Sequence, residues 1–287
     1  MRPVHPADVV TPQSLREWPL PEVADGGDKH ERGTVLVVGG SVSTPGALLL
    51  TGLAALRSGA GRLQVVTVSE TAVALAVAVP EAAVVGLAAG PDGSLAASAA
   101  DEVVSRAAQA SAVVIGPGLM STDGAGELLA AVLPRLGQTP VVLDGLALTA
   151  LTPAVLSGVT AALTPNDGEL AALLDDSALD GLEATAAVAT RYGAVVCAPG
   201  WVASPDGRCW CVEAGGIGLG TSGSGDVLAG LVGGVLARGA DPAQAAVWGQ
   251  YLHSAAGDLL TARIGRVGFL ARELLDEVPT VLRQLRP

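Results

Sequence analysis

The sequence predicts an α/β fold with a mostly parallel central sheet and helices on both faces. Short apolar runs alternate with longer helical patterns about six times along the chain, which is typical of βαβ units. Several of these runs are continuously apolar, as in strands that are buried on both faces. Half of the 287 residues are hydrophobic but only 2% are aromatic, so Ala, Val, Leu and Gly must fill the core by close helix-on-sheet packing.

The elements follow one another without a linker or an internal repeat. Residues 1–30 are rich in proline and charge and predict a surface arm with one short helical turn near 12–18. Residues 31–287 are expected to form a single domain. The expected strands are 34–38, 63–68, 82–87, 111–115, 141–143, 160–163 and 194–197, with a hairpin of 201–203 and 208–212. The expected helices are 45–58, 70–79, 95–110, 124–136, 182–192, 226–238, 242–262 and 269–285.

Charge and cysteine content limit the partners and the compartment. The formal net charge is −12, with Lys29 as the single lysine, which argues against nucleic acid and anionic membranes as partners. No apolar stretch reaches 18 residues, and the first thirty residues do not resemble a signal peptide. The three cysteines, an odd number, are expected to be reduced structural thiols. We therefore expect a cytoplasmic protein.

Loop signals gather after the expected strands. Gly39-Gly40-Ser41, Gly116-Pro117-Gly118, Asp144-Gly145 and Pro165-Asn166 each follow an apolar run. In an open α/β sheet such loops lie along one edge, where ligands bind. A tight turn alone would also account for a glycine after a strand. The repetition of the signal favours a binding edge.

A glycine-rich stretch, Gly218–Gly230, has the strongest functional signal. It combines four glycines within eight residues, an acid at Asp226 and an apolar helical pattern that begins at Val227. A helix N-terminus after such a loop exposes backbone N–H groups, which suits a phosphate. An acid at that point would repel a phosphate but could accept a proton from a hydroxyl that attacks phosphorus. The alternative is a helix that is simply N-capped by Ser224 or Asp226.

Taken together, an ordered set of motifs resembles the ADP/ATP-dependent NAD(P)H-hydrate dehydratase family, a branch of the ribokinase-like superfamily. The resemblance covers about residues 29–260, and no separate epimerase domain is expected before it. The motifs are Arg32–Ser41, Pro45-Gly46-Ala47, Ala55–Gly61, Val79-Pro80-Glu81, Ile115–Leu119, Val142-Leu143-Asp144, Leu163-Thr164-Pro165 with Gly168-Glu169, Gly223–Gly230, Tyr251-Leu252-His253 and Ala256-Gly257-Asp258.

This resemblance implies a ribokinase-like three-layer sandwich and a repair reaction. Family members phosphorylate the hydroxyl on the nicotinamide ring of hydrated NADH or NADPH and then expel phosphate, and the bacterial form typically converts ADP to AMP. Mg²⁺ and ADP or ATP are the implied cofactor and co-substrate, with ADP the expected donor. The metal ligands stay unassigned, although Asp144 could help to position a metal or a phosphate, or could simply form a turn.

The family pattern also implies the site residues. Asp226 would be the catalytic base. The hydrate would be bound by Ala47, Gly118, Asn166 and Asp226. The nucleotide would be bound by Gly223, Ser224 and Gly225, and by the segment Ala198, Pro199, Gly200, Trp201 and Val202.

Two positions depart from the family pattern. Asn166 stands where the family has a histidine, and an N-cap role for Asn166 or Asp167, with Glu169 bonding back, is an equal alternative. Ala198-Pro199 replaces a Lys-Gly pair, which removes a cation and a backbone donor. Two other functions therefore remain open: a ribokinase-like kinase that acts on another small alcohol, and a non-catalytic nucleotide-binding homologue.

Two further expectations concern a histidine and the assembly. The pattern around His253 favours a core or interhelix position. A homo-oligomer, a dimer or a tetramer, is expected through small apolar residues of the helix 45–58, unless this helix buries them against its own sheet. The residues of that face are Ala47, Leu48, Leu50, Thr51, Ala54 and Ala55.

Overall fold

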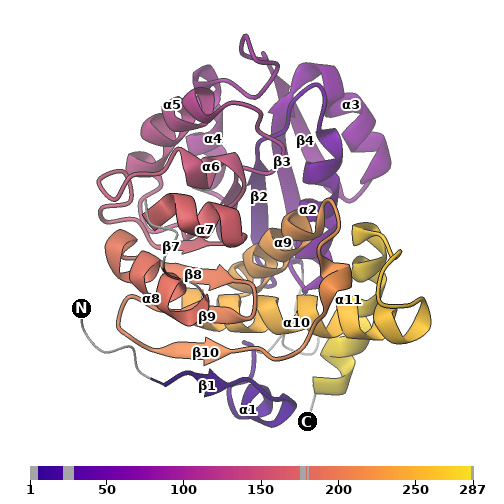
Figure 1. The fold of residues 1–287 in the computed structure, drawn as a ribbon. Helices are drawn as coiled ribbons and strands as arrows, with labels where there is room; N and C mark the ends of the chain where they lie inside the picture. Colours follow the sequence, from indigo (N-terminus) through magenta and orange to yellow (C-terminus); the bar gives the residue numbers. More distant parts are fainter. Residues whose placement is uncertain (1–5, 22–28, 175–178, 180, 286–287) are drawn as a thin grey trace.

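A ten-stranded sheet runs through the middle of the molecule (Figure 1). The computed structural model describes residues 6–21, 29–174, 179 and 181–285. The strand order is β1-β10-β9-β8-β7-β6-β5-β2-β3-β4, and β9 alone among these strands runs antiparallel to its neighbours. The predicted fold class, a mostly parallel sheet between helical layers, is confirmed.

The strands agree closely with the sequence prediction. They are β1 (Asp8–Val9), β2 (Thr34–Val38), β3 (Arg62–Val68), β4 (Ala82–Leu87), β5 (Ala112–Ile115), β6 (Val141–Leu143), β7 (Ala161–Leu163), β8 (Val195–Ala198), β9 (Trp201–Ala203) and β10 (Cys209–Cys211). Only β1 was not expected.

The α-helices are α1 (Pro12–Glu17), α2 (Pro45–Arg57), α3 (Ser69–Ala78), α4 (Ala100–Ala107), α5 (Thr122–Val132), α6 (Leu146–Thr149), α7 (Asp167–Leu174), α8 (Gly181–Tyr192), α9 (Ser224–Ala237), α10 (Pro242–Arg263) and α11 (Ala271–Leu285). The prediction missed α6 and α7, because both follow strands directly through turn-forming residues. It also extended one helix over 95–110, where α4 occupies only Ala100–Ala107. Among the described residues, no helix combines the length and the hydrophobicity needed to cross a bilayer.

The sheet separates two hydrophobic cores because neighbouring residues of a strand point to opposite faces. In β2, Val35 and Val37 belong to one core and Leu36 and Val38 to the other. Residues of α2, α9, α10 and α11 fill the first core, and residues of α4, α5 and α8 fill the second. Figure 1 shows the same two groups of helices on the two sides of the sheet. This is the three-layer arrangement that the resemblance implied.

The strand order reverses between β2 and β5. The chain runs from β2 outward to β4 and then returns to β5 on the other side of β2. In doubly wound sheets, ligands bind outside the carboxyl ends of the strands at such a reversal. The loops that follow β2 and β5 are therefore brought together, and the loops after β6, β7 and β8 lie beside them.

The described part of the N-terminal arm belongs to the folded domain. Strand β1 pairs in parallel with β10, and Leu15 of α1 is buried. The Trp18 ring stacks on Trp210 at 5.8 Å between centroids, and the Trp248 indole N–H donates to the Trp18 carbonyl at 2.9 Å. The short helix expected near 12–18 is confirmed by α1, and the few apolar side chains of residues 6–21 find partners that the local sequence does not reveal. The rest of the predicted arm, 1–5 and 22–28, lies outside the described residues.

Helices α2 and α9 pack backbone to backbone. A Cβ atom on Gly230 would lie 2.2 Å from the Thr51 carbonyl oxygen, and one on Gly234 would lie 2.0 Å from the Ser58 hydroxyl oxygen. Thr51, Ala54 and Leu48 are buried in this contact. The small residues of α2 therefore serve packing within the chain, and their predicted role as a face between subunits is wrong.

Candidate functional site

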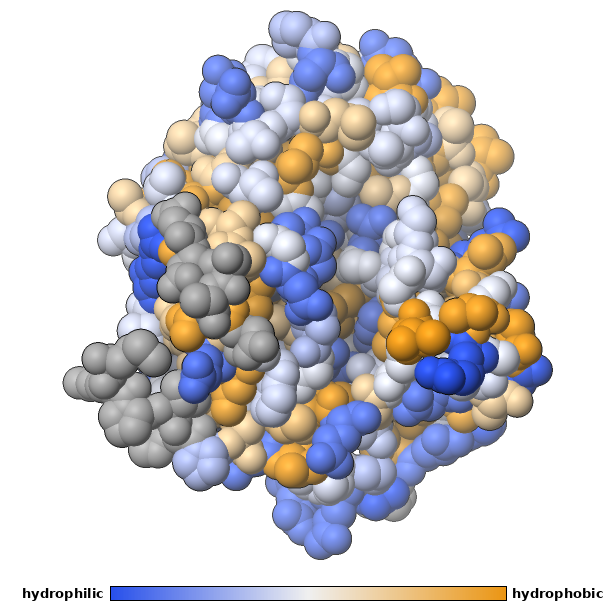
Figure 2. Space-filling view, in the orientation of Figure 1, coloured by the Kyte–Doolittle hydropathy of each residue, from blue (hydrophilic) through white to orange (hydrophobic). Residues whose placement is uncertain are grey.

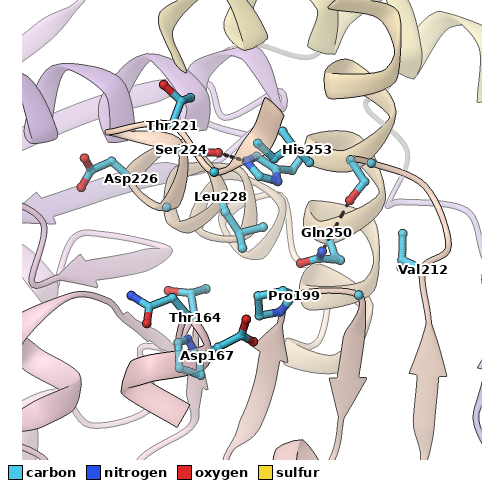
Figure 3. A pocket seen from close by; sticks show the side chains of 18 of the residues that line it. Thr164, Asp167, Pro199, Val212, Thr221, Ser224, Asp226, Leu228, Gln250 and His253 are labelled. Atoms are coloured by element: carbon cyan, nitrogen blue, oxygen red, sulfur yellow. Dashed lines mark hydrogen bonds between the residues drawn. The ribbon is translucent and has the colours of Figure 1, made fainter. Parts of the chain in front are cut away.

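A cavity of about 940 Å³ lies at the carboxyl ends of the strands, bordered by the start of α9 and by α10. Figure 2 shows this face of the molecule hollowed near its middle, with hydrophilic residues around the hollow. The residues that line the cavity come from the segments 144–145, 164–169, 199–200, 212–217, 219–228 and 250–254. Figure 3 shows side chains from opposite walls facing this space. Its volume suits a ligand of nucleotide size.

The start of α9 forms one wall and offers unpaired backbone donors. Gly223 precedes the helix at φ +86°, and a Cβ there would lie 2.5 Å from Leu50 Cδ1, so glycine is required. No side chain caps the helix. Within the described part of the chain, the N–H groups of Gly225 and Asp226 have no intramolecular acceptor. A Cβ on Gly225 would meet no protein atom within 4 Å. This geometry fits an anion seated against the helix end.

Two carboxyl groups with raised pKa values, Asp226 and Asp144, line the cavity. Burial raises the pKa of Asp226 to about 6. Asp144 is buried at the end of β6, and burial, followed by repulsion from Asp226, raises its pKa to about 7. The Thr164 hydroxyl donates to Asp144 Oδ1 at 2.8 Å and opposes part of that rise. A carboxylate poised near neutrality is suited to take a proton from an alcohol.

Asn166 caps α7 and also lines the cavity. Its side-chain oxygen accepts from the Glu169 N–H at 3.0 Å, and Glu169 accepts from the Asn166 N–H at 2.9 Å. The structure thus has the predicted capping box with Asn166 as the N-cap. Because the cavity includes Asn166 as well, the capping role and the substrate-binding role are compatible.

Only part of the predicted nucleotide segment reaches the cavity. Pro199 and Gly200 line it, whereas Ala198 and Val202 are fully buried in the two hydrophobic cores. Trp201 is partly buried and lies against Gly181, where a Cβ would be 3.2 Å from the indole nitrogen. The side chain at position 198 points into the core, so this backbone could not present a cation there.

Ala47 and Gly118 meet at the strand reversal, outside the lining of the cavity. A Cβ on Gly118 would lie 3.2 Å from the Ala47 methyl group and 2.8 Å from the Thr44 carbonyl oxygen. The Thr44 hydroxyl donates to the Gly118 carbonyl at 2.8 Å. The structure therefore brings this predicted pair together at the ends of β2 and β5, as a second region beside the cavity.

The sequence prediction gave no functional role to a polar strip of α10. Gln250, His253 and Ser254 are buried polar residues that line the cavity. His253 was predicted as a core or interhelix residue, and it does join α10 to α9 through Ser224 Oγ at 2.8 Å. Burial lowers the pKa of His253 to about 4, so the ring is neutral. Only the motif Tyr251-Leu252-His253 marked this strip in the sequence.

The lining is acidic. None of the described residues that border the cavity is lysine or arginine, whereas Asp144, Asp167, Glu169, Glu213 and Asp226 are carboxylic acids. In the described part of the chain, no group of three or more His, Cys, Asp or Glu side chains is arranged to hold a metal ion. A magnesium ion needs only one or two protein carboxylates when substrate phosphates supply its other ligands. These residues therefore fit an ion that arrives with a nucleotide.

Comparison with known proteins gives a consistent result. The sequence pattern of the NAD(P)H-hydrate dehydratase family matches residues 35–280. The ADP-dependent (S)-NAD(P)H-hydrate dehydratase of Xanthomonas campestris pv. campestris is 46% identical over 283 residues, which cover 96% of both sequences. A bifunctional NAD(P)H-hydrate repair enzyme of Moorella thermoacetica is 38% identical over 93% of this chain. The match covers 52% of that enzyme, so this chain spans about half its length.

Solved structures agree with this comparison. The ADP/ATP-dependent NAD(P)H-hydrate dehydratase of Bacillus subtilis, co-crystallised with ATP and Mg²⁺, has a TM-score of 0.80 at 30% identity over 98% of this chain and 99% of that one. A ribokinase-like superfamily protein of Enterococcus faecalis has a TM-score of 0.81 at 25% identity and covers 98% of this chain and 96% of its own. The ribokinase-like fold is thereby confirmed.

Proposed function

The chain belongs to the NAD(P)H-hydrate dehydratase family, and from this premise we propose that it repairs hydrated NAD(P)H with an adenine nucleotide as phosphoryl donor. The observation that carries the proposal is the start of α9. There a half-buried acid with a raised pKa, Asp226, stands beside unpaired backbone N–H groups. Phosphoryl transfer to an alcohol needs this combination of a base and an anion cradle.

We place the transferred phosphoryl group against Gly223, Ser224 and Gly225. The open space above Gly225 lets an oxygen approach the backbone closely, and the helix end favours its negative charge. The rest of the nucleotide then extends along the cavity toward Pro199 and Gly200. ADP is the proposed donor because the Xanthomonas relative is an ADP-dependent dehydratase.

Asp226 is the proposed base for the hydroxyl of the hydrated ring. The substrate ring would lie between Asp226 and the pair Ala47 and Gly118, with Asn166 at the margin of the cavity. Asp226 removes the hydroxyl proton as the oxygen attacks the terminal phosphorus of ADP, and AMP leaves. Loss of phosphate, together with a proton from the adjacent ring carbon, then restores the double bond of the reduced ring. Burial keeps the pKa of Asp226 high, and a base must have a raised pKa to accept the proton near neutral pH.

Mg²⁺ is the proposed metal, and it would supply charge neutralisation for the nucleotide phosphates. Asp144 is the residue we expect to hold it, together with phosphate oxygens. The lining supports this assignment, because its carboxylates would repel an anionic nucleotide and none of its described residues is lysine or arginine. We further propose that the protein acts in the cytoplasm, in agreement with its acidic charge and reduced cysteines.

We also propose a homo-oligomer, either a dimer or a tetramer. Exposed Val73 and Val77 lie one turn apart on α3, and their side chains are 75% and 77% exposed. Their helix packs against β4, one of the two edge strands of the described sheet. Light scattering at micromolar concentration should give a multiple of the 28.3 kDa chain mass that persists from low to moderate salt. A monomer mass over that whole range would reject the proposal.

The decisive experiment follows the recovery of NADH. Purified protein is incubated with hydrated NADH, Mg²⁺ and either ADP or ATP, and NADH absorbance is recorded. We expect nucleotide-dependent recovery with the wild type and little with Asp226→Asn. Equal recovery without nucleotide, or none with either nucleotide in protein shown to bind it, would reject the dehydratase assignment. Phosphorylation of a simple alcohol alone would then favour a ribokinase-like kinase.

A further inference from the structure

The hydrogen bond between Ser224 and His253 joins helices α9 and α10 in the wall of the cavity. Ser224 Oγ and His253 Nε2 are 2.8 Å apart, and both residues are buried and line the cavity. Ser224 occupies the first turn of α9, whereas His253 projects from α10. Figure 3 shows the Ser224 hydroxyl directed at the ring, while the Asp226 side chain extends in the other direction. The pair therefore does not serve as a relay to the base.

The direction of this hydrogen bond decides what Ser224 can offer a ligand. A neutral imidazole carries one N–H, so Nε2 either donates to the hydroxyl or accepts from it. If Nε2 accepts, the hydroxyl hydrogen is used within the protein and only lone pairs face the cavity. If Nε2 donates, the hydroxyl hydrogen is free for a ligand.

A phosphate can only accept hydrogen bonds from this wall. The first turn of α9 already presents backbone N–H groups to the same space, and no lysine or arginine borders the cavity in the described chain. A serine that faced a phosphate with lone pairs would add repulsion to an acidic site. Only the donating form of His253 makes Ser224 complementary to the ligand.

We propose that His253 is a positioning residue for the nucleotide, holding its proton on Nε2 so that Ser224 donates its hydroxyl hydrogen to a phosphate oxygen. The inference rests on the proposed function only in placing a phosphate at the start of α9. Ser224 is then a direct ligand of the nucleotide, and His253 acts through it. Because burial lowers the pKa of His253 and keeps its ring neutral, the tautomer of the ring sets the direction of this hydrogen bond.

Nuclear magnetic resonance tests the proposal on the unaltered protein. The chain has three histidines, His5, His30 and His253, so ¹⁵N-labelled rings can be assigned with single variants of the other two. We expect the Nε2–H tautomer for His253 in the complex with ADP and Mg²⁺, at pH values well above its transition. An Nδ1–H tautomer in that complex would overturn the proposal.

Binding of ADP measured by calorimetry, without any hydrate, gives an independent test. We expect Ser224→Ala to weaken binding about 10- to 100-fold and His253→Leu about 3- to 30-fold. His253→Gln, which can place an amide donor near the Nε2 position, should restore most of the affinity. Ser222→Ala is the control, because this exposed serine lies outside the cavity lining and should bind as the wild type does.

The double variant separates positioning from a purely structural role. Since His253 acts through Ser224, Ser224→Ala combined with His253→Leu should bind no more weakly than Ser224→Ala alone. Additive losses, or unchanged binding in Ser224→Ala with its fold verified by thermal unfolding, would overturn the inference. These readouts concern nucleotide binding alone. A failure of hydrate turnover with intact, Ser224-dependent binding would count against the proposed function and leave this inference standing.

Discussion

Two groups of glycines border the site, and the packing of the chain requires only one of them. Around the strand reversal, a Cβ on Gly116 would lie 1.9 Å from the Asp144 carbonyl oxygen and one on Gly118 2.8 Å from that of Thr44. Both have positive φ. On the nucleotide side, a Cβ on Gly225 or Gly216 would meet no protein atom within 4 Å.

The difference shows which positions can change without disturbing the fold. Around Gly118 the backbone segments touch, so a larger residue would disturb several strands at once. Along the cavity, the wall near Pro199 faces open space, and its charge can be supplied by an ion that travels with the nucleotide. The first region is fixed by packing, whereas in the second region packing leaves positions such as Gly225 and Gly216 free.

The largest expected effect concerns Asp226, the proposed base. Asp226→Asn should lower the turnover number about 10²- to 10⁴-fold, because a positioned base contributes that much to proton transfer. Affinity for ADP should stay the same or increase slightly, since a carboxylate beside the phosphate is removed. Steady-state kinetics and calorimetry measure the two quantities. A turnover number within a factor of two of wild type would exclude Asp226 as the base.

The two glycine groups should respond to alanine with stability changes of opposite sign. Gly118→Ala should lower the free energy of unfolding by roughly 1–3 kcal/mol or more, through strain at positive φ and collision with the Thr44 carbonyl. Gly225→Ala should raise it by about 0.5–1 kcal/mol, because alanine favours the helix.

Ligand binding completes this comparison. Gly225→Ala should weaken ADP binding about 10- to 100-fold, because the methyl group would occupy the space left for a phosphate. Denaturant unfolding and calorimetry on the same samples provide both values. If Gly225→Ala bound ADP as the wild type does, the anion would have to sit elsewhere.

The same contrast shows how far the sequence could predict the molecule. Runs such as Thr34–Val38 predicted the strands, and the glycine stretch before Asp226 predicted the loop and helix that border the cavity, because these features are local in sequence. The meeting of Ser224 with His253 and the burial of the Ala198 side chain depend on contacts between distant segments. The docking of β1 on β10 was missed for the same reason, whereas α6 was missed because it follows β6 directly through turn-forming residues.

Activity should fall at acid pH through the carboxyl group at the start of α9. Burial raises the pKa of Asp226 to about 6, and a base must be deprotonated to act. The value of kcat/KM should therefore rise with pH up to about 6–7, and it should be about tenfold lower one unit below the pKa. The residual activity of Asp226→Asn should lack this acid limb. An acid limb near pH 4 would instead indicate a solvent-exposed base.

The smallest expected effect concerns Pro199, which lines the cavity where the sequence has Ala198-Pro199. Pro199 is exposed and lines the cavity, whereas the neighbouring Ala198 is buried in the core. Pro199→Lys should therefore strengthen metal-free ADP binding about 3- to 30-fold, the effect of one charge-assisted contact that is partly screened by solvent. With saturating Mg²⁺ the gain in ADP affinity should shrink, because the ion already neutralises the phosphates.

Two control variants accompany this prediction. Pro199→Gln separates the added charge from the loss of proline. Ala198→Lys should destabilise the fold by burying an unpaired charge. A gain that is equal with and without Mg²⁺ would show that the ion and the lysine act at different places, and the acidic wall would then need another source of neutralisation.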